Sequence, residues 1–414
     1  MHGNVLTVQV LNGSHTKLKI LKFDIRTGER TVLFVEEQDS WVNLHDCLMR
    51  LDKVVSKFSG GFLWASEKTG FRHLYLHDKS GACLSPITQG ELMVEQIAGV
   101  NEAAGLVHFT GTADGPLESH LYCAKLFPEG SSPLQTPQRL THGKGKHVVV
   151  LLCSLSDGTA LIPPFEQPFT IPRFKWLQLE PPEIVSVKAD DGTVLYGTLY
   201  KPDARKFGPL PCRTLISVYS GPGVQLVCDS WVNTVGIRVQ YLCNKVILVW
   251  KVSISCSGIL YCFPNFSAVV LCFHDVNLEL GSLDSSPFPC FVIDQILVQS
   301  GPLWLAEAGR IGLYGWSYGG YISAMGLVKY SEIFSFAVSG APVTSWDGYN
   351  TFYTEKYMGL PSENTTNYKQ SSVMHHADFS AVRVLFKPDF TSSDPAVKLG
   401  CKFWLSLRTV LTSK

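Results

Sequence analysis

The sequence predicts two domains, an all-β domain followed by an α/β domain. The chain has 414 residues, more than one compact domain usually holds. Hydrophobic residues make up 45% and charged residues 17%, a composition typical of a folded globular protein. Short strands separated by turns fill the N-terminal part, whereas apolar strands alternate with a helical stretch in the C-terminal part.

Residues 1–165 are expected to form short antiparallel strands. Three stretches alternate in polarity and end at turns: Lys17–Asp24, Arg72–Asp78 and Glu118–Tyr122. The last two share a His-Leu-Tyr sequence at an interval of about 50 residues, the size of a four-stranded propeller blade. We therefore predict a partial β-propeller of about three blades. An antiparallel sandwich is the alternative.

A proline-rich passage, residues 166–182, is predicted to link the two domains. The α/β domain is predicted over residues 183–376, where continuous apolar runs of the kind found in buried parallel strands follow one another. The expected elements are the strands Ile184–Lys188, Val194–Tyr200, Thr214–Tyr219, Val246–Trp250, Arg310–Tyr314 and Phe336–Gly340, and a helix from Tyr318 to Tyr330.

Segment 252–303 interrupts this domain. It contains no Lys or Arg and holds four of the 12 Cys. Its beginning, Val252–Phe273, is apolar enough to suggest a membrane span, but Pro264 and Asn265 lie in its middle. A span there would also put strands of one sheet on opposite sides of a bilayer, so we expect no membrane segment.

Charge and cysteine content restrict the class of protein. Lys and Arg number 35, as do Asp and Glu, so no net charge favours nucleic acid or an acidic membrane. The chain starts without a basic segment followed by an apolar run, and its Cys form no CxxC pair. We therefore expect a cytoplasmic protein with free thiols, and neither a metal nor a cofactor.

Ser317 lies in a Gly-x-Ser-x-Gly sequence, Gly315–Gly319, between an expected strand and an expected helix. Serine nucleophiles of hydrolases occupy such a turn, which exposes the hydroxyl at the carboxyl edge of a sheet. The glycines allow close passage of the backbone, and the amino end of the helix directs N–H groups at the reacting oxygen. The pattern predicts that Ser317 is a nucleophile. A glycine-rich turn with a surface serine is the alternative.

Longer stretches around Ser317 carry a family resemblance: Arg310–Tyr321, Gly340–Tyr349, Phe352–Pro361 and Val218–Pro222. With the propeller-like region, they resemble the dipeptidyl peptidase IV group of the prolyl oligopeptidase family, and are nearest to its plant and cytosolic-type members. The resemblance implies a partial β-propeller followed by an α/β-hydrolase domain. It also implies a serine peptidase that releases N-terminal dipeptides ending in proline or alanine through an acyl-enzyme.

The resemblance assigns roles residue by residue. Ser317 is the implied nucleophile, and the Tyr219 hydroxyl and the Tyr318 backbone N–H form the implied oxyanion hole. The implied pocket for proline or alanine is lined by the Tyr318 ring, Val343, Trp346, Tyr349 and Tyr353. Aromatic walls suit a flat proline ring. The spacing of the last four residues also fits one helix face, so core packing is the alternative.

The chain departs from the family in two long stretches. In the first stretch, segment 252–303, the sequence no longer matches the family after Trp250. It resembles intron sequence translated in frame. The resemblance is expected to end at residue 376, because the tail 377–414 matches nothing in the family. That tail contains Asp378, Asp389 and Asp394 but no His. The Asp and His of the catalytic triad are therefore expected to be absent, which leaves Ser317 a weak nucleophile.

A third departure concerns substrate binding in the N-terminal domain. The family holds the amino group of its substrate with a Glu pair on a short propeller helix. Glu36-Glu37 is the only candidate pair in this region, but it follows an expected strand and does not match that motif. We expect it to be a solvated strand end.

The expected function is that of a serine-type dipeptidyl peptidase family member with impaired activity. The expected partner is a peptide substrate, with neither nucleic acid nor a membrane, and the incomplete chain disfavours the family's homodimer. The competing hypothesis is a catalytically inactive, truncated isoform that acts, if at all, as a protein-binding propeller module. A third alternative, an esterase with another triad, would need His274 as its base.

Overall fold

The computed structural model describes residues 5–51, 60–127, 136–149, 179–188, 194–208, 211–219, 221, 224–253, 305–376 and 384–387. The chain divides into two compact units: unit 1 extends to Ile171, and unit 2 begins at Pro172. Most of the predicted linker 166–182 lies outside the described residues. So do segment 252–303 beyond Ser253 and the tail 377–414 apart from Val384–Lys387.

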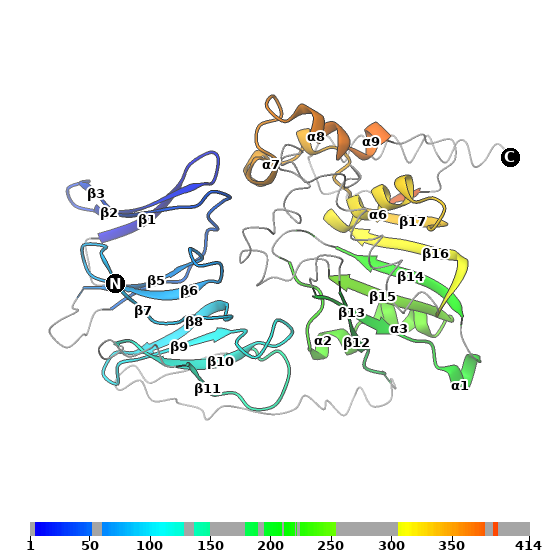
Figure 1. Ribbon diagram of the computed structural model, residues 1–414, viewed down its shortest axis with the longest axis horizontal. Helices are drawn as coiled ribbons and strands as arrows, with labels where there is room; N and C mark the ends of the chain where they lie inside the picture. Colours follow the sequence, from blue (N-terminus) through cyan, green and yellow to red (C-terminus); the bar gives the residue numbers. More distant parts are fainter. Residues whose placement is uncertain are drawn as a thin grey trace. The chain divides into compact units, whose positions relative to one another are not determined.

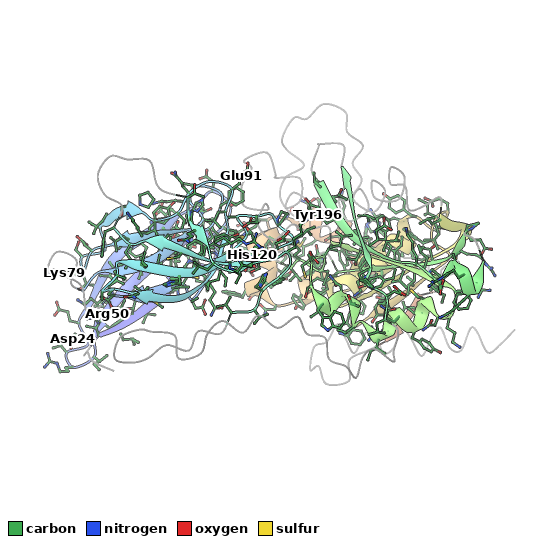
Figure 2. The ribbon with its side chains drawn as sticks, turned by 90° about the horizontal axis from the view of Figure 1, so that it is seen from below. Asp24, Arg50, Lys79, Glu91, His120 and Tyr196 are labelled. Atoms are coloured by element: carbon green, nitrogen blue, oxygen red, sulfur yellow. The ribbon has the colours of Figure 1, made fainter. Side chains whose placement is uncertain are left out.

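Unit 1 contains three antiparallel sheets, with the orders β1-β2-β3, β4-β5-β6-β7 and β11-β10-β9-β8 (Figure 1). Local sequence forms the turns: Asp24 Oδ1 accepts a hydrogen bond from the Arg26 N–H at 2.8 Å, between β2 and β3. Asp24 and Lys79 mark two of these turns in Figure 2. The strands are β1 (Val5–Leu11), β2 (Lys17–Asp24), β3 (Arg30–Glu37), β4 (Leu48–Arg50), β5 (Phe62–Ser66), β6 (His73–His77), β7 (Cys83–Pro86), β8 (Val94–Asn101), β9 (Leu106–Gly111), β10 (His120–Lys125) and β11 (Gln138–Arg139).

The three sheets stack through two hydrophobic clusters. Phe62 and Trp64 of β5 pack with Leu18 and Ile20 of the first sheet. Alternate residues of β5, beginning with Leu63, pack with the third sheet. All residues of β5 and β6 are buried, so the second sheet is covered on both of its faces.

The recurring His-Leu-Tyr sequence has a structural cause. His73 Nδ1 lies 3.1 Å from Thr88 Oγ1, which also accepts a hydrogen bond from the Leu74 N–H at 3.0 Å. In the third sheet, His120 (labelled in Figure 2) lies 3.0 Å from Thr141 Oγ1, and the next N–H donates to the same hydroxyl. Each His–Thr pair connects a strand, β6 or β10, to a threonine that lies later in the sequence. The repeat predicted from sequence is therefore a repeat of buried hydrogen bonds.

Unit 2 is an α/β domain around a seven-stranded sheet of order β12-β13-β15-β14-β16-β17-β18 (Figure 1). The five strands from β15 to β18 in this order are parallel to one another. β13 pairs antiparallel with both of its neighbours, β12 and β15. The strands are β12 (Glu183–Lys188), β13 (Val194–Tyr200), β14 (Cys212–Val218), β15 (Ile247–Ser253), β16 (Ala306–Trp316), β17 (Phe336–Gly340) and β18 (Val384–Lys387). The helices are α1 (Ala204–Phe207), α2 (Trp231–Thr234), α3 (Ile237–Cys243), α6 (Tyr318–Lys329), the 3-10 helix η3 (Trp346–Gly348), α7 (Thr351–Met358), α8 (Thr365–Gln370) and α9 (Val373–His376).

The strands and the helix predicted for the second domain are confirmed within one to four residues at their ends. One predicted strand continues into segment 252–303, and one strand of the sheet was not predicted. β15 continues to Ser253, which pairs with Tyr196, so the first residues of segment 252–303 belong to the sheet. β18 lies in the tail 377–414 and pairs in parallel with β17, from Ala337 opposite Val384 to Gly340 opposite Lys387.

The expectation of a solvated strand end at Glu36-Glu37 is wrong for Glu36. Its carboxylate is half-buried and accepts hydrogen bonds from Trp64 Nε1 at 2.9 Å and from Ser66 Oγ at 2.5 Å. Glu37 is exposed and pairs with Lys17. Glu36 therefore joins the first sheet to the second, because alternation along β3 turns it inward and Glu37 outward.

Two further expectations concern thiols and membranes. The Cys of the described part of the chain are free: Cys47, Cys83, Cys123, Cys212, Cys228 and Cys243. No helix among the described residues is long and apolar enough to cross a membrane.

Candidate active site

Ser317 occupies a single-residue turn between β16, which ends at Trp316, and α6, which begins at Tyr318. Its backbone has φ 57° and ψ −117°, a conformation that costs a non-glycine residue on the order of 1–3 kcal/mol. The Ser317 N–H donates to Gly340 O of the neighbouring strand at 2.8 Å, which holds the turn in place. This is the strained strand-to-helix turn that the Gly-x-Ser-x-Gly sequence predicts.

The two flanking glycines are required by close packing of the backbone. A Cβ on Gly315 would lie 2.1 Å from Gly319 O, and a Cβ on Gly319 would lie 2.2 Å from Val218 O. Real Cβ atoms essentially never approach other atoms to under 3.0 Å. Side chains at these positions would therefore push α6 away from the sheet.

Tyr219 lies at the same edge of the sheet as Ser317. It follows β14, whose last residue, Val218, pairs with Gly315. A Cβ on Gly319 would lie 3.0 Å from Tyr219 Cα, so the start of α6 touches the backbone at Tyr219. The Tyr318 N–H belongs to the first residue of α6, at the positive end of the helix dipole. The two groups predicted to form the oxyanion hole thus flank the elbow.

The predicted pocket residues form a continuous aromatic cluster with the elbow. The Tyr318 ring lies 6.5 Å from that of Tyr219 and 5.4 Å from that of Trp346. Trp346 in turn lies 5.9 Å from Tyr349 and 6.3 Å from Tyr353, where the rings are stacked. These centroid distances are typical of packed aromatic pairs.

These residues do not share one helix face, but the burial of Val343 and Trp346 also agrees with the core-packing alternative. Val343 is buried in the segment before η3, whereas Trp346 lies in η3 and Tyr353 in α7. Tyr349 lies between η3 and α7. The side chains therefore converge from three separate pieces of backbone.

Burial sets the chemistry of the cluster. It raises the pKa of Tyr353 far above its ordinary value, and the neighbouring phenols of Tyr357, Tyr219 and Tyr349 raise it further. The Tyr353 hydroxyl therefore stays protonated at any physiological pH. The sequence interpretation did not include Tyr321, whose ring lies 5.6 Å from that of Tyr318. It also omitted Tyr357, 5.1 Å from Tyr353. Both could have been found from helical spacing to a predicted residue.

A catalytic base is missing from the described surroundings of Ser317. Among the described residues, no His and no carboxylate side chain makes a hydrogen bond to the Ser317 hydroxyl. His376 Nε2 instead lies 2.6 Å from Gln370 O, and Lys329 is one of the charges acting on it. Lys329 ends α6, about 18 Å along the helix from Ser317. His376 and the adjacent His375 therefore lie near the carboxyl end of α6, opposite to the end that carries Ser317.

Models of two protein families match the chain. The "Dipeptidyl peptidase IV (DPP IV) N-terminal region" matches residues 1–170, and the "Prolyl oligopeptidase family" matches residues 295–387. The chain belongs to the dipeptidyl peptidase IV group of the prolyl oligopeptidase family. The second match begins inside segment 252–303 and includes β18, so it continues past residue 376, where the resemblance was expected to end.

Relatives in this family are longer than the chain. It is 31% identical to Dipeptidyl peptidase 8 of Mus musculus over 400 residues, which cover 84% of the chain and 43% of the relative. For Dipeptidyl peptidase 8 of Homo sapiens, the identity is 30% and the shares are 84% and 42%. The chain spans less than half the length of these relatives.

The fold also agrees with that of a solved family member. The crystal structure of Porphyromonas gingivalis dipeptidyl peptidase 4 matches with a TM-score of 0.71 and 22% identity, over 92% of this chain and 53% of that chain. This match and the α/β sheet of unit 2 agree with the predicted hydrolase fold.

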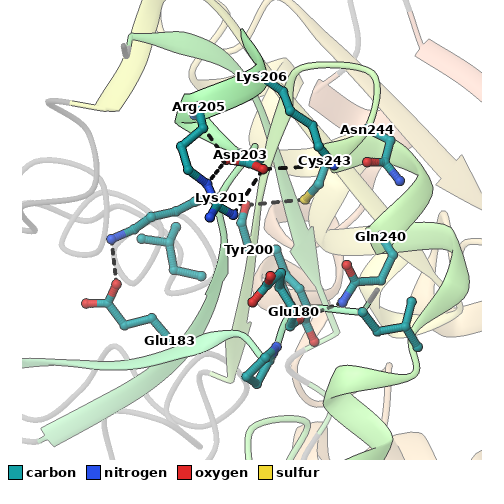
Figure 3. Close-up of a pocket in the computed structure, with 13 residues that line it drawn as sticks. Glu180, Glu183, Tyr200, Lys201, Asp203, Arg205, Lys206, Gln240, Cys243 and Asn244 are labelled. Carbon is teal, nitrogen blue, oxygen red and sulfur yellow. Dashed lines mark hydrogen bonds and ion pairs between the residues drawn. The ribbon is translucent and has the colours of Figure 1, made fainter. Parts of the chain in front are cut away.

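A pocket of about 880 Å³ lies in unit 2 of the chain, away from Ser317 (Figure 3). Its lining includes Tyr200, at the end of β13, and Asn244, just before β15 begins. Because β15 and β16 are parallel to β14, the start of β15 lies at the opposite sheet edge from Ser317. Most of its charged residues form ion pairs with one another: Lys201 with Glu183 at 2.5 Å, and Arg205 and Lys206 with Asp203. In the described part of the chain, no group of three or more His, Cys, Asp or Glu is placed to hold a metal ion.

Proposed function

We propose that the site is built to release N-terminal dipeptides ending in proline or alanine, with Ser317 as the nucleophile. The observation that carries the proposal is the strained backbone of Ser317, φ 57°, between a buried parallel strand and a helix. Such strain persists only where surrounding packing enforces it, and it concentrates at active sites. The relatives' names, dipeptidyl peptidase 8 and dipeptidyl peptidase 4, support the same reaction.

In the proposed reaction, the Ser317 oxygen attacks the carbonyl carbon of the second residue of the peptide. The proton of the Ser317 hydroxyl passes to a base. The carbonyl oxygen becomes an oxyanion that accepts hydrogen bonds from the Tyr318 N–H and the Tyr219 hydroxyl. The C–N bond breaks, and the amine leaves with the proton that the base returns. Water then hydrolyses the ester on Ser317 and releases the dipeptide.

The aromatic cluster supports the proposed preference for proline or alanine. Its rings are closely packed, so a small flat side chain fits against them better than a charged or branched one. A proline ring would lie against aromatic faces with its apolar surface removed from water. The proposed pocket consists of Tyr318, Val343, Trp346, Tyr349 and Tyr353.

We also propose that this chain has little or no peptidase activity of its own. His375 and His376 lie near the far end of α6, and residues 377–414 contain no His. A serine without its base keeps the weak nucleophilicity of a free hydroxyl. In subtilisin, loss of the base alone removes roughly 10⁶-fold in kcat.

A fluorophosphonate probe tests the position of the nucleophile separately from turnover. We expect slow labelling confined to Ser317, abolished by Ser317→Ala and retained in Ser345→Ala, which removes a hydroxyl from the segment before η3. Mass spectrometry of the labelled peptide identifies the site. Labelling at another serine would refute the assignment of Ser317.

The second candidate function is a non-catalytic, protein-binding module. The stacking of three antiparallel sheets in unit 1 supports a partial β-propeller as its basis. An absence of any probe labelling, with the protein folded, would favour this candidate. The cytoplasmic location and the peptide partner expected from the sequence remain predictions.

A further inference from the structure

A row of polar side chains crosses three parallel strands in the middle of the sheet of unit 2. Ser217 of β14 pairs with Lys251 of β15 on one side and with Tyr314 of β16 on the other. Residues paired in this way point to the same face of a sheet, so the three side chains lie side by side. Each of the three is half-buried, whereas the residues before and after it in its strand are buried. A strip with one positive charge and two hydroxyls therefore runs across one face of the sheet.

Helix α3 lies on the same face and adds a second cation. Lys251 Nζ would lie 3.7 Å from a Cβ at Gly236, the residue that precedes α3. The same ammonium lies 5.1 Å from the ring centroid of Tyr200, which packs in a cluster with α3. Arg238, the second residue of α3, donates a hydrogen bond to the Tyr314 hydroxyl, and its guanidinium lies 5.3 Å from that ring.

The side chain of Arg238 spans the polar row. Helix α3 packs against β15 and β13, whereas Tyr314 belongs to β16, two strands away from β15. To reach Tyr314, the Arg238 side chain therefore extends across β14, the strand that carries Ser217. The Lys251 ammonium and the Arg238 guanidinium thus lie on the helix side of the row, with the Ser217 hydroxyl on its sheet side.

The two cations have no acidic partner among the described residues. Neither Lys251 nor Arg238 forms an ion pair with a described carboxylate. Burial lowers the pKa of Lys251, and the positive charge of Arg238 lowers it further, although the Cys228 thiol acts in the opposite direction. The two positive charges therefore repel one another, and an anion between them would remove this repulsion.

We propose that Lys251 and Arg238 bind a phosphate group between α3 and the sheet. The ammonium and the guanidinium donate charge-assisted hydrogen bonds to phosphate oxygens, and the Ser217 hydroxyl donates a third from the strand below. A tetrahedral oxyanion suits this arrangement because its oxygens point in four directions, towards the helix side and towards the sheet. The two oxygens of a carboxylate lie in one plane and would leave one of the donors unused.

The partial exposure of the donors predicts a weak site. Two charge-assisted contacts that remain open to water on one side give a dissociation constant on the order of 1 mM. Salt screens such contacts, so sodium chloride should weaken the binding of phosphate. None of the residues that form this site belongs to the aromatic cluster at Ser317.

Phosphorus NMR of the 414-residue chain tests the proposal, with sodium phosphate as the probe. The width of the phosphate resonance is measured from roughly 0.1 to 20 mM phosphate at constant ionic strength, a range that brackets the expected dissociation constant. We expect a saturable broadening that corresponds to one site per chain. Lys251→Met removes the charge and keeps an apolar stem, and it should weaken binding at least about tenfold. Arg238→Gln should weaken binding to a similar degree.

Lys245→Met is the matched control. The Lys245 ammonium lies 5.5 Å from the Tyr241 ring, much as Lys251 lies beside Tyr200, but Lys245 is exposed and lies beyond the carboxyl end of α3. This variant should bind phosphate as the wild type does. Lys251→Arg should retain binding, because it keeps the positive charge. Arg238 is exposed, so Arg238→Gln decides the question even where Lys251→Met does not fold.

A second titration distinguishes the sources of the phosphate group. Phenyl phosphate replaces inorganic phosphate in the same measurement. Equal affinity for both would assign the site to phosphate monoesters, and binding of inorganic phosphate alone would assign it to the free ion.

Three results would overturn the proposal. The first is a phosphate resonance that stays sharp, or broadens without saturation, throughout the range. The second is unchanged binding in folded Lys251→Met and Arg238→Gln. The third is a loss in Lys245→Met as large as that in Lys251→Met, because it would show that phosphate responds to the overall charge of the surface.

Discussion

Replacing Gly315 by alanine tests whether close backbone packing holds the elbow. The new Cβ would lie 2.1 Å from Gly319 O, whereas ordinary contact begins at 3.4 Å, so α6 or the strand must move by about 1.3 Å. Overpacking against backbone, which has no rotamer to change, costs about 3 kcal/mol or more. For a domain of this size each kcal/mol lowers Tm by about 2–4 °C, so we expect a fall of about 6–12 °C.

Differential scanning calorimetry measures this fall in unit 2, with Gly348→Ala as the control. A Cβ on Gly348 meets nothing within 4 Å. Neither Gly315 nor Gly348 has a positive φ, so both substitutions are free of backbone strain and differ in packing alone. The control should stay within about 1 kcal/mol of the wild type. A Gly315→Ala protein that melts with the wild type, or with an equally destabilised control, would refute the packing argument.

Three further predictions concern buried polar groups. Glu36→Ala should destabilise unit 1 by about 1.5–3 kcal/mol and Glu37→Ala by under about 1 kcal/mol in urea unfolding, because Glu36 alone accepts hydrogen bonds from the second sheet. Equal losses would contradict this. Burial lowers the pKa of His45 from 6.5 to about 4. The unfolded chain therefore takes up the proton first, and unit 1 should lose stability as pH falls from 6.5 to 4. His45→Asn should flatten the pH dependence of Tm, and an unchanged slope argues against His45. Burial raises the pKa of Tyr200 from 10.0 to about 12. Unit 2 should lose stability as pH rises from 10 to 12, less so in Tyr200→Phe, and an identical loss in both would exclude Tyr200.

Local patterns in the sequence predicted the elements and the nucleophile. Alternation placed β2 at Lys17–Asp24, because every second residue of a strand faces the core. The Gly-x-Ser-x-Gly sequence predicted the elbow because the contact that requires glycine, between Gly315 and Gly319, spans only four residues. Contacts between residues so close in the sequence can be predicted from a single sequence.

Features that depend on distant partners could not be predicted in the same way. Glu36 is half-buried because Trp64, 28 residues away, donates to it. The spacing of the pocket residues suggested one helix, but Asn350 Oδ1 accepts from the Tyr353 N–H at 3.1 Å and caps α7, which starts a new element there. That Asn cap was a local signal that the helical interpretation overlooked.

The tail shows a further limit of sequence patterns. β18 pairs with β17 over four residues, from Val384 to Lys387. So short an apolar run cannot be told from a loop without its sheet neighbour. The family match through residue 387 agrees with this strand.

Hydrolysis of a Gly-Pro amide by the purified chain and by Ser317→Ala tests most directly whether Ser317 acts without a base. The elbow and its oxyanion donors are present, but no His among the described residues makes a hydrogen bond to Ser317. We expect both proteins to release the amine at the same background rate. Turnover by the wild type that Ser317→Ala abolishes would contradict this expectation, because it would require a base that acts on Ser317.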